Sequence, residues 1–266
     1  MINANDILFR CSSLGHLMTE PKSKTEPLSD TTKTHLIDTF ISVHYKRNEE
    51  LQNKFLDKGN AREEDSITLL SRVKKLMLKK NDTRLSNEFI TGELDVFLGK
   101  DVNNADETFD TKTSWSAFTF FRAQKELNKM YYWQGQGYMA LSGAKKHTVA
   151  YCLVNGTAQA IDDEKRRLSY RMNLLDPSLS DEYKKKCQQI EINHIFDINS
   201  FVKENPFYDF HSDLATWDYD ISPSERVFTF EFERDDVAIQ KLYDRIIECR
   251  KWMNANLFRS IPELVS

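Results

Sequence analysis

Three charged residues in the first half of the chain have the types and spacing of a metal-dependent hydrolytic site. Asp110 and Lys112 are separated by one residue, and Asp95 precedes Asp110 by fifteen. Because strand side chains alternate between faces, Asp110 and Lys112 should project from the same side of one strand. The segments 89–98 and 108–113 are strand-like and flank a loop rich in turn residues, which predicts a hairpin with Asp95 on the neighbouring strand. Two carboxylates beside an ammonium group suit a hard cation such as Mg²⁺.

A D-x-K triplet alone is weak evidence, because most such triplets are solvated strand faces with a weak surface ion pair. Further residues flank this one at positions that favour a site: Gly59, Glu63, Gly92, Gln134 and Gln136. Taken alone, the two glutamines are ordinary polar helix positions, and their place after the triplet favours a role beside it. The aromatic residues around them are typical of core packing: Tyr131, Tyr132, Trp133 and Tyr138.

The whole-chain composition suits a soluble globular protein. The chain has 266 residues, of which 40% are hydrophobic and 29% are charged, and this length can bury one substantial core. No apolar run approaches the roughly 20 residues of a membrane helix, and the first residues do not have the pattern of a secretory signal. The four cysteines (Cys11, Cys152, Cys187 and Cys249) are far apart, so no zinc or iron–sulfur spacing is visible. We therefore expect reduced cysteines, no membrane association and a cytoplasmic location.

The net charge of −4 does not indicate a dedicated nucleic-acid binder, whose domain is usually basic. The objection is weaker for a nuclease, because bound metal compensates its carboxylates and local basic patches can hold phosphates. The candidate patches are Lys74, Lys75, Lys79, Lys80 and Arg84, then Lys145 and Lys146, then Lys184 to Lys186. Each run is more often a solvated helix face than a DNA contact, and the first is the best candidate because it follows Glu63 on an expected helix.

Hydrophobic spacing predicts a mixed α/β protein. Helices are expected within 7–18 and over about 31–57, 60–80, 125–142, 158–175, 181–196 and 236–257, and further strands over 146–154 and 227–234. Each interior glycine costs a helix about 1 kcal/mol relative to alanine, so Gly135 and Gly137 indicate a helix backbone close to the sheet or the substrate. The order predicts a mixed sheet flanked by helices in a single domain, 1–266, with a mostly helical insertion at about 157–222.

With these elements in order, the chain resembles the PD-(D/E)xK nuclease superfamily, and within it the lambda-type phage exonucleases, also called the YqaJ viral recombinase family. The likeness rests on Gly59-x-x-x-Glu63, Gly92-x-x-Asp95, Asp110-x-Lys112 and Gln134-x-Gln136, followed by Tyr138. It covers most of the chain and implies a restriction-endonuclease-like core. The sequence departs from the family pattern at two positions. Leu94 replaces the leading proline, and Asp110 replaces a commoner glutamate but still supplies a metal-binding carboxylate.

The resemblance implies roles for the motif residues. The expected ligands of one or two Mg²⁺ or Mn²⁺ ions are Asp95, Asp110 and the Thr111 carbonyl, with Glu63 completing a second metal site or holding its water. Two ions about 4 Å apart can activate the attacking water and stabilise the leaving oxygen. Lys112 is expected to orient or deprotonate that water, and Gln134 to position Lys112 or the water.

The resemblance also implies a substrate. Arg10, Ser12 and Ser13 lie in the neighbourhood where the family binds a terminal 5′-phosphate, and Gln136 is a further substrate-binding candidate. The implied activity is metal-dependent hydrolysis of linear double-stranded DNA from its 5′ ends. The implied partners are further copies of the chain in a ring and a single-strand annealing protein of phage recombination, in the cytoplasm of a bacterial host.

Two alternatives stay open. One is a structure- or sequence-specific endonuclease of the same superfamily. The other is a catalytically inert DNA-binding or assembly protein that kept the fold, against which the intact carboxylates and lysine argue. A related exonuclease with an iron–sulfur cluster is disfavoured, because the cysteines lack its clustered spacing.

Overall fold

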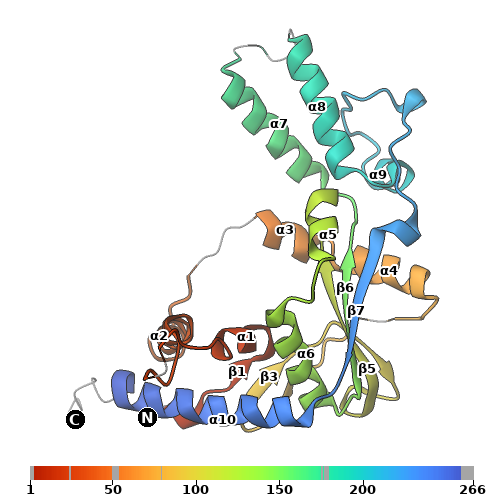
Figure 1. Ribbon diagram of the computed structural model, residues 1–266. Coiled ribbons are helices and arrows are strands. Elements are labelled where there is room, and N and C mark those ends of the chain that lie inside the picture. The colour runs from red at the N-terminus through yellow and green to blue at the C-terminus, as the bar shows by residue number, and fades with distance from the viewer. Residues whose placement is uncertain are drawn as a thin grey trace.

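Two β-sheets flanked by helices make up the protein in a computed structural model, which describes residues 3–23, 25–49, 54–78, 80–174, 176 and 180–258 (Figure 1). The strands are β1 (Phe9–Arg10), β2 (Leu85–Ser86), β3 (Ile90–Gly92), β4 (Val96–Gly99), β5 (Ala105–Thr113), β6 (Lys146–Cys152) and β7 (Val227–Glu233). The α-helices are α1 (Leu14–Leu17), α2 (Asp30–Tyr45), α3 (Lys54–Ala61), α4 (Glu63–Lys74), α5 (Ala117–Ala123), α6 (Lys129–Ser142), α7 (Ala158–Met172), α8 (Asp181–His194), α9 (Ile198–Glu204) and α10 (Asp236–Met253). This architecture confirms the fold class expected from the sequence.

The larger sheet has the strand order β4-β5-β6-β7. Its central pair, β5 and β6, is parallel, and α5 and α6 supply the crossover that parallel strands require. Side chains alternate along β6: Ala150 and Cys152 pack in a cluster with Leu70 of α4, whereas Val149 packs in a cluster with Phe120 of α5. Consequently α4 covers one face of the sheet, and α5 and α6 cover the other (Figure 1).

The smaller sheet, with the order β1-β3-β2, joins the N-terminal helices to the end of the chain. Its cluster of buried residues draws Leu14 from α1, Leu36 from α2 and Leu242 from α10. Figure 1 shows α10 running along the base of the molecule. None of the described helices is long and apolar enough to cross a membrane.

The expected hairpin is present, but its first arm is divided between the two sheets. β3 pairs with β1 and β2, the chain bends at Asp95, and only β4 pairs with β5, with Val96 opposite Phe109. The bend is fixed from outside the hairpin, because the amide of Asn81 donates to the Asp95 carbonyl (2.8 Å) and Lys80 forms a bridge with Val96. The division places Asp95 where the two sheets meet.

Two expected helices end earlier than their apolar patterns indicate. The helix expected over 31–57 ends at Tyr45, the last residue of α2, because Lys46 adopts a left-handed φ of 56°. α4 covers only part of the helix expected over 60–80, because Lys75 adopts a φ of 55°. A residue with non-helical backbone angles, Arg62, separates α3 from α4.

The two glycines of α6 allow the close approach that the sequence indicated. A Cβ atom at Gly135 would lie 2.4 Å from Cδ2 of His147 on β6 and 2.6 Å from Cζ of Phe232 on β7. One at Gly137 would lie 2.5 Å from Cδ1 of Leu14 on α1. The helix backbone is therefore packed against the larger sheet on one side and against α1 on another.

The segment expected as an insertion, about 157–222, holds α7, α8 and α9 and has hydrophobic clusters of its own. One is built on Ile161, Ile195 and Phe201, and a second on Leu168 and Tyr183 among others. Figure 1 shows α7 and α8 projecting beyond the end of β6, away from α10. We propose that this segment is an insertion within a single domain, since the chain leaves from β6 and returns to β7, its neighbour in the sheet.

Lys58 of α3 is a buried lysine at the connection between β5 and α5. Its Nζ donates to the carbonyls of Ser114 (3.0 Å) and Trp115 (3.2 Å). Burial, followed by the charge of Arg62, lowers the pKa of Lys58 from 10.5 to about 7. Between these pH values the unfolded chain binds the additional proton, so the contribution of Lys58 to stability should rise with pH from about 7 to about 10.5.

Urea denaturation of the wild type and Lys58→Met across that range measures this effect. The difference in unfolding free energy should shift steadily in favour of the wild type as pH rises. A difference that does not change with pH would contradict the lowered pKa of Lys58.

Candidate active site

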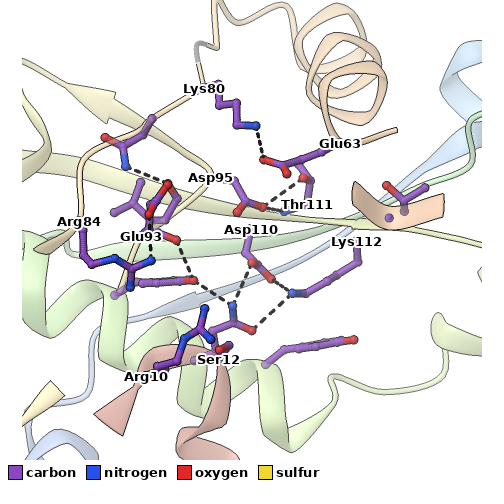
Figure 2. Close-up of a pocket in the computed structure, with 17 residues that line it drawn as sticks. Arg10, Ser12, Glu63, Lys80, Arg84, Glu93, Asp95, Asp110, Thr111 and Lys112 are labelled. Atoms are coloured by element: carbon purple, nitrogen blue, oxygen red, sulfur yellow. Dashed lines mark hydrogen bonds and ion pairs between the residues drawn. The ribbon is translucent and has the colours of Figure 1, made fainter. Parts of the chain in front are cut away.

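A pocket of about 780 Å³, called the D-x-K pocket below, collects most of the residues that the sequence singled out (Figure 2). It is lined by Arg10, Ser12, Gly59, Glu63, Lys80, Asn81, Arg84, Glu93, Leu94, Asp95, Asp110, Thr111, Lys112, Thr113, Tyr131, Gln134 and Tyr138. In Figure 2, Glu63 and Lys80 lie on one side of Asp95 and Asp110, and Arg10 and Ser12 lie on the other. Segments distant in sequence thus converge on the end of β5.

Asp110 and Lys112 project from one face of β5, as strand alternation predicts. Nζ of Lys112 lies 2.6 Å from Oδ2 of Asp110. Burial lowers the pKa of Lys112, but Asp110, Tyr131 and Asp95 together outweigh burial, so the pKa is raised overall. The ammonium group also lies 4.4 Å from the ring centroid of Tyr131. Lys112 is therefore a charged donor held between a carboxylate and an aromatic face.

Asp95 meets the same strand from the bend before β4. Its Oδ2 accepts hydrogen bonds from the amide of Thr111 (2.7 Å) and from the hydroxyl of Thr111 (3.1 Å). Burial, followed by the charge of Asp110, raises the pKa of Asp95 to about 7. Two carboxylates are thus crowded together at a cost that a bound cation would relieve.

Gln134 of α6 forms hydrogen bonds with three side chains that line the pocket. Its Nε2 donates to Oδ1 of Asp110 (3.1 Å) and to the hydroxyl of Tyr138 (3.0 Å), and its Oε1 accepts from Nζ of Lys112 (3.4 Å). The Tyr138 hydroxyl in turn donates to the carbonyl of Glu93 (3.1 Å). One buried amide therefore fixes the relative positions of a carboxylate and an amine on β5.

Ion pairs cross the mouth of the pocket. Glu63 lies 3.4 Å from Lys80, and Glu93 lies 3.0 Å from Arg84. Lys80 and Arg84 of the first basic run therefore do reach the pocket, although they lie beyond α4 rather than on the expected helix. Lys74 of that run pairs instead with Glu231 (2.9 Å), and Lys79 lies outside the described residues.

The four substrate-binding candidates divide into two pairs. Arg10 and Ser12 line the D-x-K pocket. Ser13 does not, and its hydroxyl donates to the Arg10 carbonyl (2.9 Å). Gln136 is fully buried, donates to the carbonyl of Glu233 (3.0 Å) and accepts from the amide of Asp235 (2.9 Å), so it closes the turn between β7 and α10. The structure does not bring Ser13 or Gln136 to the site.

Three residues have functions in the pocket that the sequence did not assign. Tyr131 supports Lys112, and Tyr138 supports Gln134; both follow from helical spacing, since residues three or four apart on α6 share a face with Gln134. Asn81 donates through Nδ2 to the Leu94 carbonyl (3.0 Å) and so holds the rim against the bend that carries Asp95. No local pattern indicates such a long-range contact.

The donor set fits a divalent cation. Oδ2 of Asp110 is buried, and within the described residues it has an ion pair with Nζ of Lys112 (2.6 Å) but no hydrogen bond from an uncharged donor. No three carboxylate, imidazole or thiolate groups in the described ranges are close enough to form a complete metal site. Mg²⁺ usually takes only one or two carboxylates and completes its shell with waters and phosphate oxygens. The fitting residues are Asp95 and Asp110, with Glu63 on the rim.

Solved structures share this fold over nearly the whole chain. A phage-related exonuclease from Haemophilus somnus 129PT has a TM-score of 0.66 and 26% sequence identity, over 96% of this chain and 97% of that chain. An alkaline exonuclease (LHK-Exo) from Laribacter hongkongensis has a TM-score of 0.57 and 11% identity, over 96% of this chain and 92% of that chain. The complex of LHK-Exo with dAMP has a TM-score of 0.56. No family model and no curated protein matches the chain.

The fold and the D-x-K pocket together define a protein with the PD-(D/E)xK nuclease fold. Within that class, the match to a phage-related exonuclease along almost the full length of both chains confirms the resemblance to lambda-type phage exonucleases that the motifs indicated.

Proposed function

We propose that this protein is a DNA exonuclease of the phage recombination type, which hydrolyses phosphodiester bonds at the ends of linear double-stranded DNA. The observation that carries the proposal is the D-x-K pocket, where Asp95, Asp110 and Lys112 converge. The fold shared with exonucleases supports it.

The residues of the pocket divide the chemistry between them. Asp95 and Asp110 would hold Mg²⁺ or Mn²⁺, with the Thr111 carbonyl as a further ligand and Glu63 beside a second ion or its water. A divalent ion bound there lowers the pKa of a water and offsets the charge that develops on the phosphate. Lys112 donates to the attacking water or to a phosphate oxygen. Gln134 keeps Lys112 and Asp110 aligned.

Arg10 and Ser12 support the assignment of a direction. A guanidinium and a hydroxyl at one edge of the pocket suit a terminal phosphate, because arginine donates to phosphate oxygens in a bidentate manner. We therefore propose attack from 5′ ends, which leaves a 3′ overhang. A ring of several copies and cooperation with a single-strand annealing protein are proposed from the resemblance, and sedimentation of the purified protein tests the ring.

The decisive assay uses linear duplexes labelled at one end or the other, with a circular plasmid as the control. With Mg²⁺ or Mn²⁺, the 5′ label should be released first, circles should stay intact, and EDTA should stop the reaction. Cleavage of circles would instead indicate an endonuclease of the same superfamily. No hydrolysis with either metal would indicate an inert DNA-binding protein.

Matched leucine substitutions at the two glutamines of α6 should have different effects on hydrolysis rate and on stability. Gln134→Leu should lower the hydrolysis rate by about 10- to 100-fold, because Asp110 and Lys112 lose the amide that aligns them. Gln136→Leu should leave the rate per folded molecule unchanged but lower the unfolding free energy by about 1–3 kcal/mol, because two backbone groups lose their partner. Single-turnover rates and urea denaturation measure the two effects. Equal rate losses in both variants at equal folded fraction would assign the effect to helix packing.

A further inference from the structure

A groove of about 640 Å³, called the α5–α6 groove below, lies beside the D-x-K pocket along the connection between those helices. Tyr131 lines both hollows. Since Nζ of Lys112 lies 4.4 Å from the centroid of the Tyr131 ring, the groove begins next to the proposed reaction centre.

The groove is basic on a chain whose net charge is negative. Three cations line it, Arg122, Lys125 and Lys129, against one carboxylate, Glu126. Within the described ranges none of the three cations forms an ion pair. The whole chain, by contrast, carries a net charge of −4. These cations are free to meet the phosphates of a bound strand.

Two exposed phenyl rings stand on α5, the helix whose last two residues, Arg122 and Ala123, line this groove. The helix buries Phe120 against the larger sheet, with 1% of that residue exposed, whereas Phe118 and Phe121 are 65% and 57% exposed. Residues three apart share a helix face, so the two rings lie on one side, and Phe121 directly precedes Arg122. Apolar rings in water beside unpaired cations are the combination that binds unpaired bases and their backbone.

We propose that the α5–α6 groove and the rings of Phe118 and Phe121 bind a single-stranded stretch of DNA continuous with the strand in the D-x-K pocket, a proposal that rests on the proposed function. A duplex offers phosphates to the cations but keeps its base faces stacked, whereas an unpaired strand offers both. The pocket lined by Lys58 and Trp115 is a poorer path, because three carboxylates line it against two cations. The excess of cations and the shared residue Tyr131 thus favour the α5–α6 groove as the path of the strand.

The test is binding of a fluorescent oligothymidylate, measured by anisotropy in EDTA so that hydrolysis does not interfere. The double variant Phe118→Ala/Phe121→Ala should bind at least about 25-fold more weakly, because stacking on each ring contributes about fivefold or more. The double variant Arg122→Ala/Lys125→Ala should reduce the slope of log affinity against log salt by about 0.7 for each cation removed. The matched controls are Phe207→Ala, at a residue 97% exposed outside the groove, and Lys203→Ala, at an exposed residue of α9. Both should bind as the wild type does.

Thermal unfolding of all four variants verifies that they fold. Wild-type affinity in both groove variants would overturn the proposal. Loss of affinity in the cation variant alone would assign the groove to a duplex backbone, and altered sedimentation of the phenylalanine variant would assign the rings to a subunit or protein interface; each result would overturn single-strand binding.

The binding assay, combined with the assay on end-labelled duplexes, separates this proposal from the proposed function. If the wild type hydrolyses no duplex but its oligothymidylate affinity depends on Phe118 and Phe121, the nuclease assignment fails and the groove stands. If it hydrolyses duplexes and the affinity is independent of both rings, only the groove assignment fails.

Discussion

Replacement of Asp110 by asparagine should reduce the hydrolysis of linear duplex DNA by at least about 100-fold, because a carboxylate ligand contributes several kcal/mol through the ion that it holds. Asparagine has the same shape and keeps an oxygen for Nε2 of Gln134, so the change removes charge with little change in packing. Single-turnover rates at saturating Mg²⁺ measure the loss. Calorimetric titration with Mn²⁺ should show weaker binding by the same variant.

The matched control lies on the same strand. Asp106 is an exposed residue of β5, and Asp106→Asn should keep the wild-type rate and the wild-type affinity for Mn²⁺. A wild-type rate in Asp110→Asn would remove Asp110 from the metal site and with it the central premise of the proposed mechanism.

Lys112→Met should lower the hydrolysis rate by about 10²- to 10⁴-fold, the usual range for a group that positions or transfers a proton. Metal binding should persist, because both carboxylates remain. The combination distinguishes Lys112 from Asp110: one variant loses rate alone, the other loses rate and metal together. Single-turnover rates and Mn²⁺ calorimetry on the same preparation provide both values.

The lysine variant needs its own controls. Lys112→Met removes the ammonium that lies 2.6 Å from a buried carboxylate, so the metal-free protein should be less stable and the assay should be run with metal present. Lys100→Met, at an exposed residue after β4, should behave as the wild type does. An unchanged rate in Lys112→Met would exclude Lys112 from the chemistry.

Local periodicity predicted the parts of the site that lie within one element. Asp110 and Lys112 share a face because strands repeat every two residues. The same periodicity argument excludes the prediction that Gln136 joins Gln134 in the site. Residues two apart on a helix point in different directions, so when Gln134 faces β5, Gln136 faces the turn after β7.

Features that depend on distant contacts were not predictable. The bend at Asp95 is held by Asn81, fourteen residues earlier in the chain, and no local pattern around either residue indicates this contact. Helix ends at Lys46 and Lys75 carried no signal either, because a lysine seldom adopts a positive φ. The order of elements survived these errors, since it depends on the number and type of apolar segments rather than on their ends.

The tight contact of α6 with β6 has a consequence for interpreting mutations. A methyl group at Gly135 would enter the space of His147 and Phe232 and force the helix outward, and the amide of Gln134 would move with it. Inactivation by a substitution at Gly135 would therefore look like the loss of a catalytic group, although this position has no side chain. Screens that rank residues by lost activity should score it beside the carboxylates for purely geometric reasons.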